Sequence, residues 1–320
     1  MKTQMKIQRY ALALDVGGTF LKSALISSKG SILEDSFMKI PIDSKATKGV
    51  IIGTFIETMQ SNLEIAEKYE LEVAGIGIGT PGPFNYDEGI SLMKHKFRTI
   101  YGLNLKREFM RRLSLEKGFR IRFEVDAWSF LRGEAWLGAA QGYDRTVGVT
   151  LGTGLGSAFM ANNQIVMKGP GVPPHAWIGG LPNNNGIVED KISQRGILAR
   201  YKELSENKIS ENLTVREIAL RGKKNNERQS LQVFEELGSN LSQVLKPVLS
   251  SFNAQCLVLG GQISKSFSLF ESQLKNNLQS IPSLIEISQA QLIDRSALYG
   301  ATKLVFLRKV QSWGVIGVNE

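Results

Sequence analysis

Residues 10–22, YALALDVGGTFLK, constrain the fold more than any other part of this chain. Six mostly apolar residues, 11–16, predict a short buried strand. The two glycines that follow, Gly17 and Gly18, supply the backbone freedom for a tight turn. A second strand, FLKSALI, comes next, and a third is expected after the turn SSKG, from about Ser31. The chain is therefore predicted to begin its fold with a β-hairpin.

Asp15 stands at the end of the first strand, beside the glycine turn. Backbone N–H groups of such a turn can face a phosphate, and a carboxylate next to them can hold a hydrated metal ion. Gly17, Gly18, Thr19 and Lys22 are accordingly candidate ligands of a phosphate or of Mg²⁺, together with Asp15. An ordinary hairpin with an exposed Asp at its end is the alternative interpretation.

The same arrangement occurs a second time in residues 147–161, VGVTLGTGLGSAFMA. Here a strand leads into a Gly-Thr-Gly turn and a further strand follows. The candidate phosphate-binding residues are Gly152, Thr153, Gly154 and Gly156. Two phosphate-binding hairpins in one chain predict two lobes that grip one nucleotide.

This duplication resembles the actin-like ATPase and sugar kinase superfamily. Within it, residues 11–309 are similar to the ROK family of sugar kinases and sugar-responsive repressors. The resemblance implies an α/β, ribonuclease H-like fold of two lobes, each a mixed sheet flanked by helices, with a ligand cleft between them. The first lobe would span residues 1–125, with a helix at about 294–310 packing back on it, and the second would span 126–293. ATP and Mg²⁺ are the implied cofactors, and family members are often homodimers.

Composition agrees with a globular protein of two domains. The chain has 320 residues, of which 42% are hydrophobic and 22% charged. Its single cysteine, Cys256, excludes an internal disulfide and suits a reducing cytosol. The apolar run at residues 11–16 is too short for a signal peptide or a membrane span. We therefore expect a cytoplasmic protein without a membrane partner.

The net charge of +9 raises the question of nucleic acid. The basic residues are scattered in short clusters, at 94–98, 106–112 and 223–228, without a compact basic helix. Only about ten residues precede the first hairpin, so no helix-turn-helix is expected there. Nucleic acid is thus not an expected partner. A basic surface can attract ATP or a sugar phosphate, or it can simply be solvated.

A strand at residues 72–79 stops abruptly at Thr80-Pro81-Gly82-Pro83. Strand ends in α/β sheets commonly carry ligand contacts. The family has a similar loop near its sugar, which makes Pro81 and Gly82 candidate sugar contacts. A simple Pro-Gly turn is the alternative.

Asp126 follows a predicted strand at residues 120–125 and opens a helix at 127–138. The resemblance implies that it is the catalytic base. A carboxylate within reach of a sugar hydroxyl can accept its proton while the oxygen attacks the γ-phosphorus. Asp is also a common helix N-cap, which is the structural alternative for Asp126.

Residues 169–193 occupy the place of the family's signature. In the family, this signature consists of a Glu, a His three residues later, a zinc-binding Cys cluster and a final Glu. Here His175 stands at the first Glu position, Ile178 at the His position and Glu189 at the final Glu, and no cysteine is present. Val125 stands where a sugar-contacting Asn is usual. A zinc site is therefore not expected. His175 and Glu189 remain candidate sugar ligands. Leaving a sugar hydroxyl without a hydrogen-bond partner is costly, and several of the family's usual partners are missing here. The residues present therefore do not identify the hexose.

A buried strand at residues 255–259 ends in Gly260-Gly261-Gln262-Ile263-Ser264. By resemblance, Gly260, Gly261 and Gln262 lie near the adenosine of ATP. A turn between strand and helix also needs glycine for its geometry, and the two interpretations are compatible.

The sequence thus predicts an ATP-dependent kinase for a hexose, glucokinase-like first, with an N-acetylated hexosamine or a mannose-type sugar next. Two alternatives stay open. One is a sugar-sensing protein of the same family without kinase activity, which the altered signature favours. The other is a phosphotransferase of the superfamily that acts on another acceptor, such as a small acid.

Overall fold

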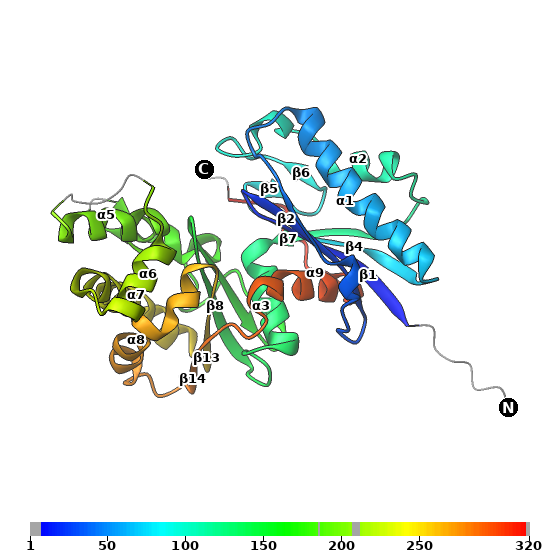
Figure 1. Cartoon of the computed structure of the whole chain (residues 1–320). Coiled ribbons are helices and arrows are strands. Elements are labelled where there is room, and N and C mark those ends of the chain that lie inside the picture. Colours follow the sequence, from blue (N-terminus) through cyan, green and yellow to red (C-terminus); the bar gives the residue numbers. More distant parts are fainter. Residues whose placement is uncertain (1–7, 185, 207–211, 318–320) are drawn as a thin grey trace. The chain divides into compact units, whose positions relative to one another are not determined.

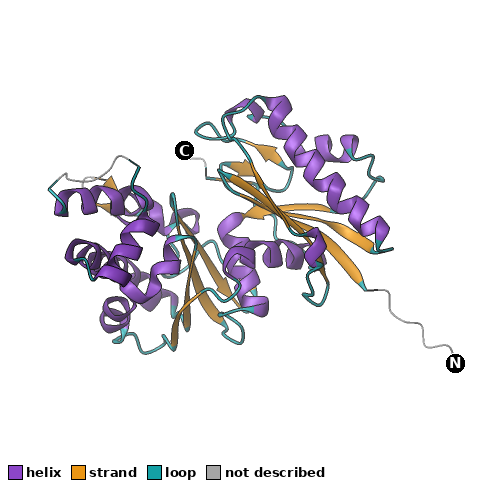
Figure 2. Cartoon of the chain, viewed as in Figure 1, coloured by secondary structure: helices purple, strands orange, loops and turns teal. Residues whose placement is uncertain are grey.

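A computed structural model describes residues 8–184, 186–206 and 212–317. It shows two compact units, Met1–Leu137 with Arg295–Glu320 (unit 1) and Gly138–Asp294 (unit 2). Each unit is a mixed sheet flanked by helices, which confirms the predicted fold class (Figure 2). The division between the units lies at Leu137, because the helix that follows Val125 packs within unit 1.

Unit 1 is built on a five-stranded sheet of order β3-β2-β1-β4-β7 (Figure 1). Strands β1, β3, β4 and β7 run in the same direction, and β2 runs antiparallel to them. The strands are β1 (Arg9–Val16), β2 (Phe20–Ser27), β3 (Met38–Pro41), β4 (Glu72–Thr80) and β7 (Ile121–Val125). The helices are α1 (Lys48–Lys68), α2 (Leu105–Arg112), α3 (Asp126–Leu137) and α9 (Ser296–Phe306).

The two faces of this sheet are covered by different helices. Leu12 and Leu14 of β1 belong to the core that α1 completes, whereas Ala13 packs with Leu298 and Ala301 of α9. This alternation is the period of two expected of a strand whose faces are both buried.

The third strand begins later than the sequence predicts. It is β3, from Met38, and the chain between it and β2 makes a single bridge, Ile26 to Ile32, and a short 3₁₀ helix. The hydroxyl of Ser36 accepts a hydrogen bond from the backbone N–H of Leu25, at 2.8 Å. A side chain thus satisfies a donor of β2 that a strand starting at Ser31 would have paired.

Unit 2 repeats the plan with a sheet of order β10-β9-β8-β13-β14. Its strands are β8 (Arg145–Leu151), β9 (Leu155–Ala161), β10 (Gln164–Ile165), β13 (Cys256–Gly260) and β14 (Glu286–Gln289). The helices are α4 (Val188–Ile192), α5 (Gln194–Leu204), α6 (Val215–Asn225), α7 (Arg228–Phe252) and α8 (Glu271–Leu278). Helices α4 and α5 are separate, because Ser193 between them has an extended backbone with ψ of 172°.

Smaller elements complete the chain. Two short sheets are β15-β5-β6 and β11-β12, with β5 (Phe84–Asn85), β6 (Ile90–Ser91), β11 (Pro182–Asn183), β12 (Gly186–Ile187) and β15 (Val315–Ile316). The 3₁₀ helices are η1 (Glu34–Ser36), η2 (Arg98–Ile100), η3 (Pro174–Ala176), η4 (Ile178–Gly180), η5 (Ile263–Leu269) and η6 (Ile293–Arg295). Among the described residues, no helix is long and apolar enough to cross a membrane.

Candidate active site

The first glycine turn joins β1 to β2 as the sequence predicts. Asp15 lies opposite Lys22 in the hairpin register, and the Lys22 Nζ donates to Asp15 Oδ2 at 3.0 Å. The N–H of Gly17 closes the turn by donating to the carbonyl of Phe20 at 2.9 Å. An anion at this turn would therefore meet the N–H groups of Gly18 and Thr19, both of which are exposed.

Asp126 is the first residue of α3, directly after β7, and it is partly buried. Burial raises the pKa of its carboxyl group, the positive charge of Lys96 opposes that rise, and the negative charge of Asp15 adds to it. The carboxylate also accepts the backbone N–H of the next residue, Ala127, at 2.8 Å. The structure thus brings Asp15 and Asp126 close enough for their charges to interact.

Two residues that the sequence interpretation missed, Tyr86 and Lys96, also lie near enough to Asp126 for an electrostatic interaction. The pKa of the Tyr86 hydroxyl is raised well above its usual value, first by burial and then by the charges of Asp126 and Glu124. That hydroxyl donates to the carbonyl of Thr80 at 3.0 Å. Both residues come from the segment between β4 and α2, whose path the sequence pattern does not define.

Glu124 is fully buried two residues before Asp126 and holds the start of α3 in place. It accepts hydrogen bonds from Ser129 and from the Arg132 guanidinium, at 2.9 to 3.1 Å. A buried carboxylate needs such partners, since a buried charge without them is costly. The neighbouring Val125 supplies no polar group.

The loop after β4 carries the predicted sugar contacts Pro81 and Gly82. A Cβ at Gly82 would lie 3.1 Å from the carbonyl oxygen of Ile316 and 3.4 Å from the Tyr86 hydroxyl. Pro81 is buried. This loop is therefore tightly packed against Tyr86, whose hydroxyl group interacts electrostatically with Asp126.

The second glycine turn, between β8 and β9, closes in a similar way. The N–H of Gly152 donates to the carbonyl of Gly154 at 3.0 Å. Glu189 supports the turn from α4, since its Oε2 accepts the N–H of Leu155 at 2.8 Å. A Cβ at Gly154 would lie 2.7 Å from the same oxygen, so a larger residue there would displace the Glu189 side chain. Gly156 lies in β9, opposite Thr150 of β8.

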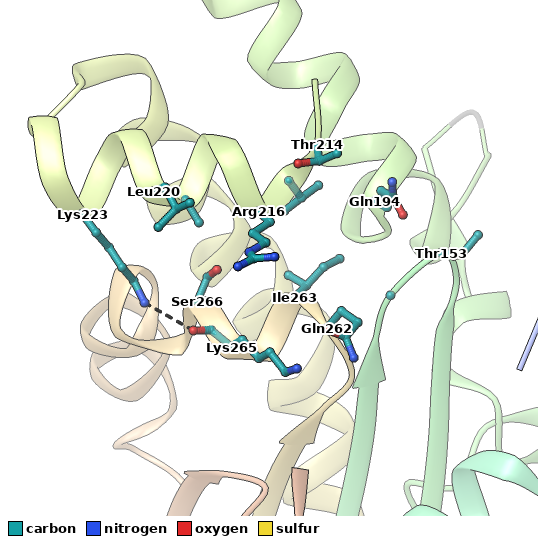
Figure 3. A pocket seen from close by; sticks show the side chains of 13 residues that line it. Thr153, Gln194, Thr214, Arg216, Leu220, Lys223, Gln262, Ile263, Lys265 and Ser266 are labelled. Atoms are coloured by element: carbon teal, nitrogen blue, oxygen red, sulfur yellow. Dashed lines mark hydrogen bonds between the residues drawn. The ribbon is translucent and has the colours of Figure 1, made fainter. Parts of the chain in front are cut away.

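A cavity of about 530 Å³ in unit 2 joins the second glycine turn to the predicted adenosine turn (Figure 3). Gly152, Thr153 and Gln262 line it together. The remaining lining residues come mainly from α6 and η5 and were not predicted: Gln194, Thr214, Val215, Arg216, Ala219, Leu220, Lys223, Ile263, Lys265 and Ser266.

The chemistry of this cavity suits an anionic ligand. Arg216, Lys223 and Lys265 contribute positive charge to its lining. The amide of Gln262 and the ammonium of Lys265 are both held by Asp294, at 2.8 and 2.9 Å. Thr214 and Glu217 form a capping box that fixes the start of α6 beside the cavity.

Glycine is required at Gly261. Its φ is +82°, and a Cβ there would lie 2.3 Å from the carbonyl oxygen of Leu151, the residue that precedes the second glycine turn. Gly260 is buried at the end of β13. Close packing of two backbones thus fixes the turn after β13 against the end of β8.

The altered signature residues lie apart from this cavity's lining. His175 is exposed in η3 with a left-handed backbone (φ 55°), and Ile178 is fully buried in the apolar core of unit 2. Ile178 therefore offers a sugar no polar group. Within the described residues, no cluster of three His, Cys, Asp or Glu side chains has the geometry of a metal site.

Comparison with known proteins agrees with this architecture. The ROK family model matches residues 11–307. The chain is 24% identical to a glucokinase from Thermotoga maritima over 92% of this chain and 96% of the relative. It is 26% identical to an N-acetyl-D-glucosamine kinase from Haemophilus influenzae over 92% and 99% of the two chains.

Among solved structures, a ROK family glucokinase from Streptomyces griseus, in complex with glucose and AMPPNP, shares the fold with a TM-score of 0.75. Its sequence identity to this chain is 20%, and the match covers 92% of this chain and 98% of that one. Because the family model spans most of the chain, the protein belongs to the ROK family.

Proposed function

We propose that this protein is an ATP-dependent kinase that transfers the γ-phosphoryl group of ATP to a hydroxyl of a hexose, with Asp126 as general base. The observation that carries the proposal is the position of Asp126, a carboxyl group of raised pKa at the end of β7, beside the Asp15 turn. Membership in the ROK family supports the same reaction class. A glucokinase and an N-acetyl-D-glucosamine kinase among its relatives make glucose and N-acetylglucosamine the first acceptors to test.

The chemistry assigned to each residue is simple. Asp126 takes the proton of the acceptor hydroxyl while that oxygen forms a bond to the γ-phosphorus and the bond to the β-phosphate oxygen breaks, releasing ADP. A raised pKa makes the carboxylate a better proton acceptor than an ordinary Asp. The cavity in unit 2, with its three cationic side chains, would hold the nucleotide.

Asp15 suits a role beside Mg²⁺. Carboxylate oxygens are the protein ligands that this ion prefers, and Asp15 stands next to exposed backbone N–H groups that can face a phosphate. Bound with ATP, Mg²⁺ would neutralise charge on the phosphates. Lys22 forms an ion pair with Asp15 at 3.0 Å and so holds its side chain at the turn.

The proposal is tested by coupled ATP consumption across a panel of hexoses and N-acetylhexosamines, with Asp126→Asn measured in parallel. Removing a general base typically lowers kcat by about 10²–10⁴. Asp144→Asn, an exposed carboxyl group in unit 2, is the matched control and should keep the rate. Sugar-dependent turnover that survives in Asp126→Asn would contradict the assigned role.

A sugar-sensing protein without kinase activity is the second candidate, and the burial of Ile178 and the apolar Val125 favour it. Both positions lack the polar groups that hold a hexose in the family's usual pattern. Sugar binding without turnover, measured by calorimetry on the same preparation, would support this alternative.

A further inference from the structure

The last residues of the chain lie beyond the ROK family match, which ends at residue 307. Residues 311–317, here called the C-terminal segment, return to unit 1 after α9. Strand β15 within it pairs antiparallel with β5, with Ile316 opposite Phe84 and Val315 opposite Asn85. The segment therefore adds an edge strand to the small sheet that follows the Pro81–Gly82 turn.

Asp87 is the main anchor of the C-terminal segment. Its carboxylate accepts the backbone N–H of Trp313 at 3.0 Å and of Gly314 at 2.8 Å, and the hydroxyl of Ser312. The N–H of Tyr86 in turn donates to the carbonyl of Gly314 at 3.0 Å. Hydrogen bonds to a charged acceptor are stronger than those between neutral groups. The Asp87 carboxylate therefore holds residues 312–314 firmly in one position.

An aromatic cluster links the segment to the start of α3. The ring of Trp313 packs edge-on against Trp128, with centroids 4.8 Å apart, and Trp128 stacks with Tyr86 at 6.2 Å. Trp128 is 1% exposed and lies two residues after Asp126, in the first turn of the helix. Trp313 therefore contacts the turn that carries the proposed base.

The backbone of the segment also contacts the predicted sugar loop. The carbonyl oxygen of Ile316 lies so close to Gly82 that a Cβ there would be 3.1 Å from it, and a Cβ at Gly317 would lie 3.3 Å from Pro83. The segment thus touches two of the structures that would hold the acceptor, the Pro81–Gly82 turn and the first turn of α3.

We propose that residues 311–317 position the acceptor site: by fixing the Pro81–Gly82 loop and the first turn of α3, they hold the acceptor hydroxyl against Asp126. The inference rests on the proposed kinase function. Asp87 and Trp313 are then positioning residues, which act on the acceptor through the loop and through Trp128. This chain would use them to define a site that lacks several of the family's usual sugar contacts.

The test compares the full chain with Asp87→Ala, with Trp313→Ala and with a chain that ends at Val310. Each change should raise the acceptor KM by about ten-fold or more, equal to about 1.4 kcal/mol, and leave the KM for ATP unchanged. Trp313→Phe keeps an aromatic ring and should restore most of the acceptor affinity. Glu88→Ala, at the exposed neighbour of Asp87, is the control and should behave as the full chain.

Hydrogen exchange provides a readout that needs no turnover. Asp87→Ala should speed exchange in residues 80–92 and 126–131 and leave unit 2 unchanged, which also shows that the variant is folded. An acceptor KM and an exchange pattern equal to those of the full chain would overturn the inference. If the full chain phosphorylates no sugar, the proposed function fails, and the exchange comparison still decides whether the segment holds the loop.

Discussion

At the scale of single residues, opposing electrostatic effects set the pKa of the Asp126 carboxyl group. Burial and the negative charge of Asp15 favour the protonated carboxyl group, whereas the positive charge of Lys96 favours the carboxylate. The first influence is the larger, so the pKa is raised. A base of this kind is active only when deprotonated, so kcat/KM should fall as the pH drops through its pKa.

This balance predicts the effect of Lys96→Met. Removing the positive charge should raise the pKa of Asp126 further and move the acidic limb of the kcat/KM profile to higher pH. The measurement is the sugar-dependent rate between pH 4 and pH 9, roughly the range in which carboxyl and imidazole groups titrate.

Lys94→Met is the matched control for that experiment. Lys94 is exposed two residues away, beside the ring of Tyr101, and is not among the charges that act on Asp126. Its removal should leave the acidic limb in place. An acidic limb that stays fixed in Lys96→Met, or that moves to lower pH, would contradict the assignment of Asp126 as the titrating base.

The sequence predicts the positions of those site residues that are marked by a local pattern, that is, by the residues next to them in the chain. Asp15 and Gly152 stand at the ends of apolar strands beside glycines, and such a pattern is local. Tyr86 and Lys96 reach Asp126 through an irregular segment between β4 and α2, and no periodic pattern encodes that path. The attachment of Trp313 to Asp87 joins residues 226 positions apart, a pairing that a single sequence does not reveal.

At the scale of elements, α3 and α9 cross with their backbones in near contact. A Cβ at Gly300 would lie 1.8 Å from the carbonyl oxygen of Ser129, and a Cβ at Gly133 would lie 2.0 Å from that of Ser296. Helix α9 also approaches β4, where a Cβ at Gly77 would lie 2.0 Å from the carbonyl of Ala301. Three glycines thus allow a close packing of two helices and a strand.

Gly300→Ala should therefore disrupt unit 1. Two backbones that must separate to admit a methyl group typically cost about 1–3 kcal/mol of stability, as overpacked cores do. Because α3 begins at Asp126, the same shift should also lower kcat. The urea midpoint of unfolding and the rate with saturating sugar measure the two effects.

Gly49→Ala provides the comparison for this variant. Gly49 lies in α1, and a Cβ there meets no atom within 4 Å. Alanine is the better helix former, so this change should raise the free energy of unfolding by up to about 1 kcal/mol, and the urea midpoint should stay the same or rise slightly. Equal midpoints for the two variants would show that the crossing of α3 and α9 tolerates a side chain.

At the scale of the whole molecule, each unit carries its own part of the proposed reaction. Unit 1 holds Asp126, the Asp15 turn and the predicted sugar loop, whereas unit 2 holds the second glycine turn and the cationic cavity. The two-unit plan follows from the repeated hairpin in the sequence. The place of α3 in unit 1 does not, because it depends on the packing of α3 against α9, which lies far along the chain.

This division predicts which residues each ligand protects from hydrogen exchange. A non-hydrolysable ATP analogue should protect the lining of the cavity in unit 2, around residues 152–154, 214–223 and 261–266, whereas the acceptor sugar should protect residues 80–92 and 126–131 of unit 1. Ligand present at 100 times its Kd stabilises the folded state by about 2.7 kcal/mol, enough to slow exchange clearly.

Gly261→Ala should remove the protection by nucleotide, because its Cβ would lie 2.3 Å from the Leu151 carbonyl, and it should leave the protection by sugar intact. Nucleotide protection that persists in this variant, or that falls only on unit 1, would mean that the cavity is not where ATP binds.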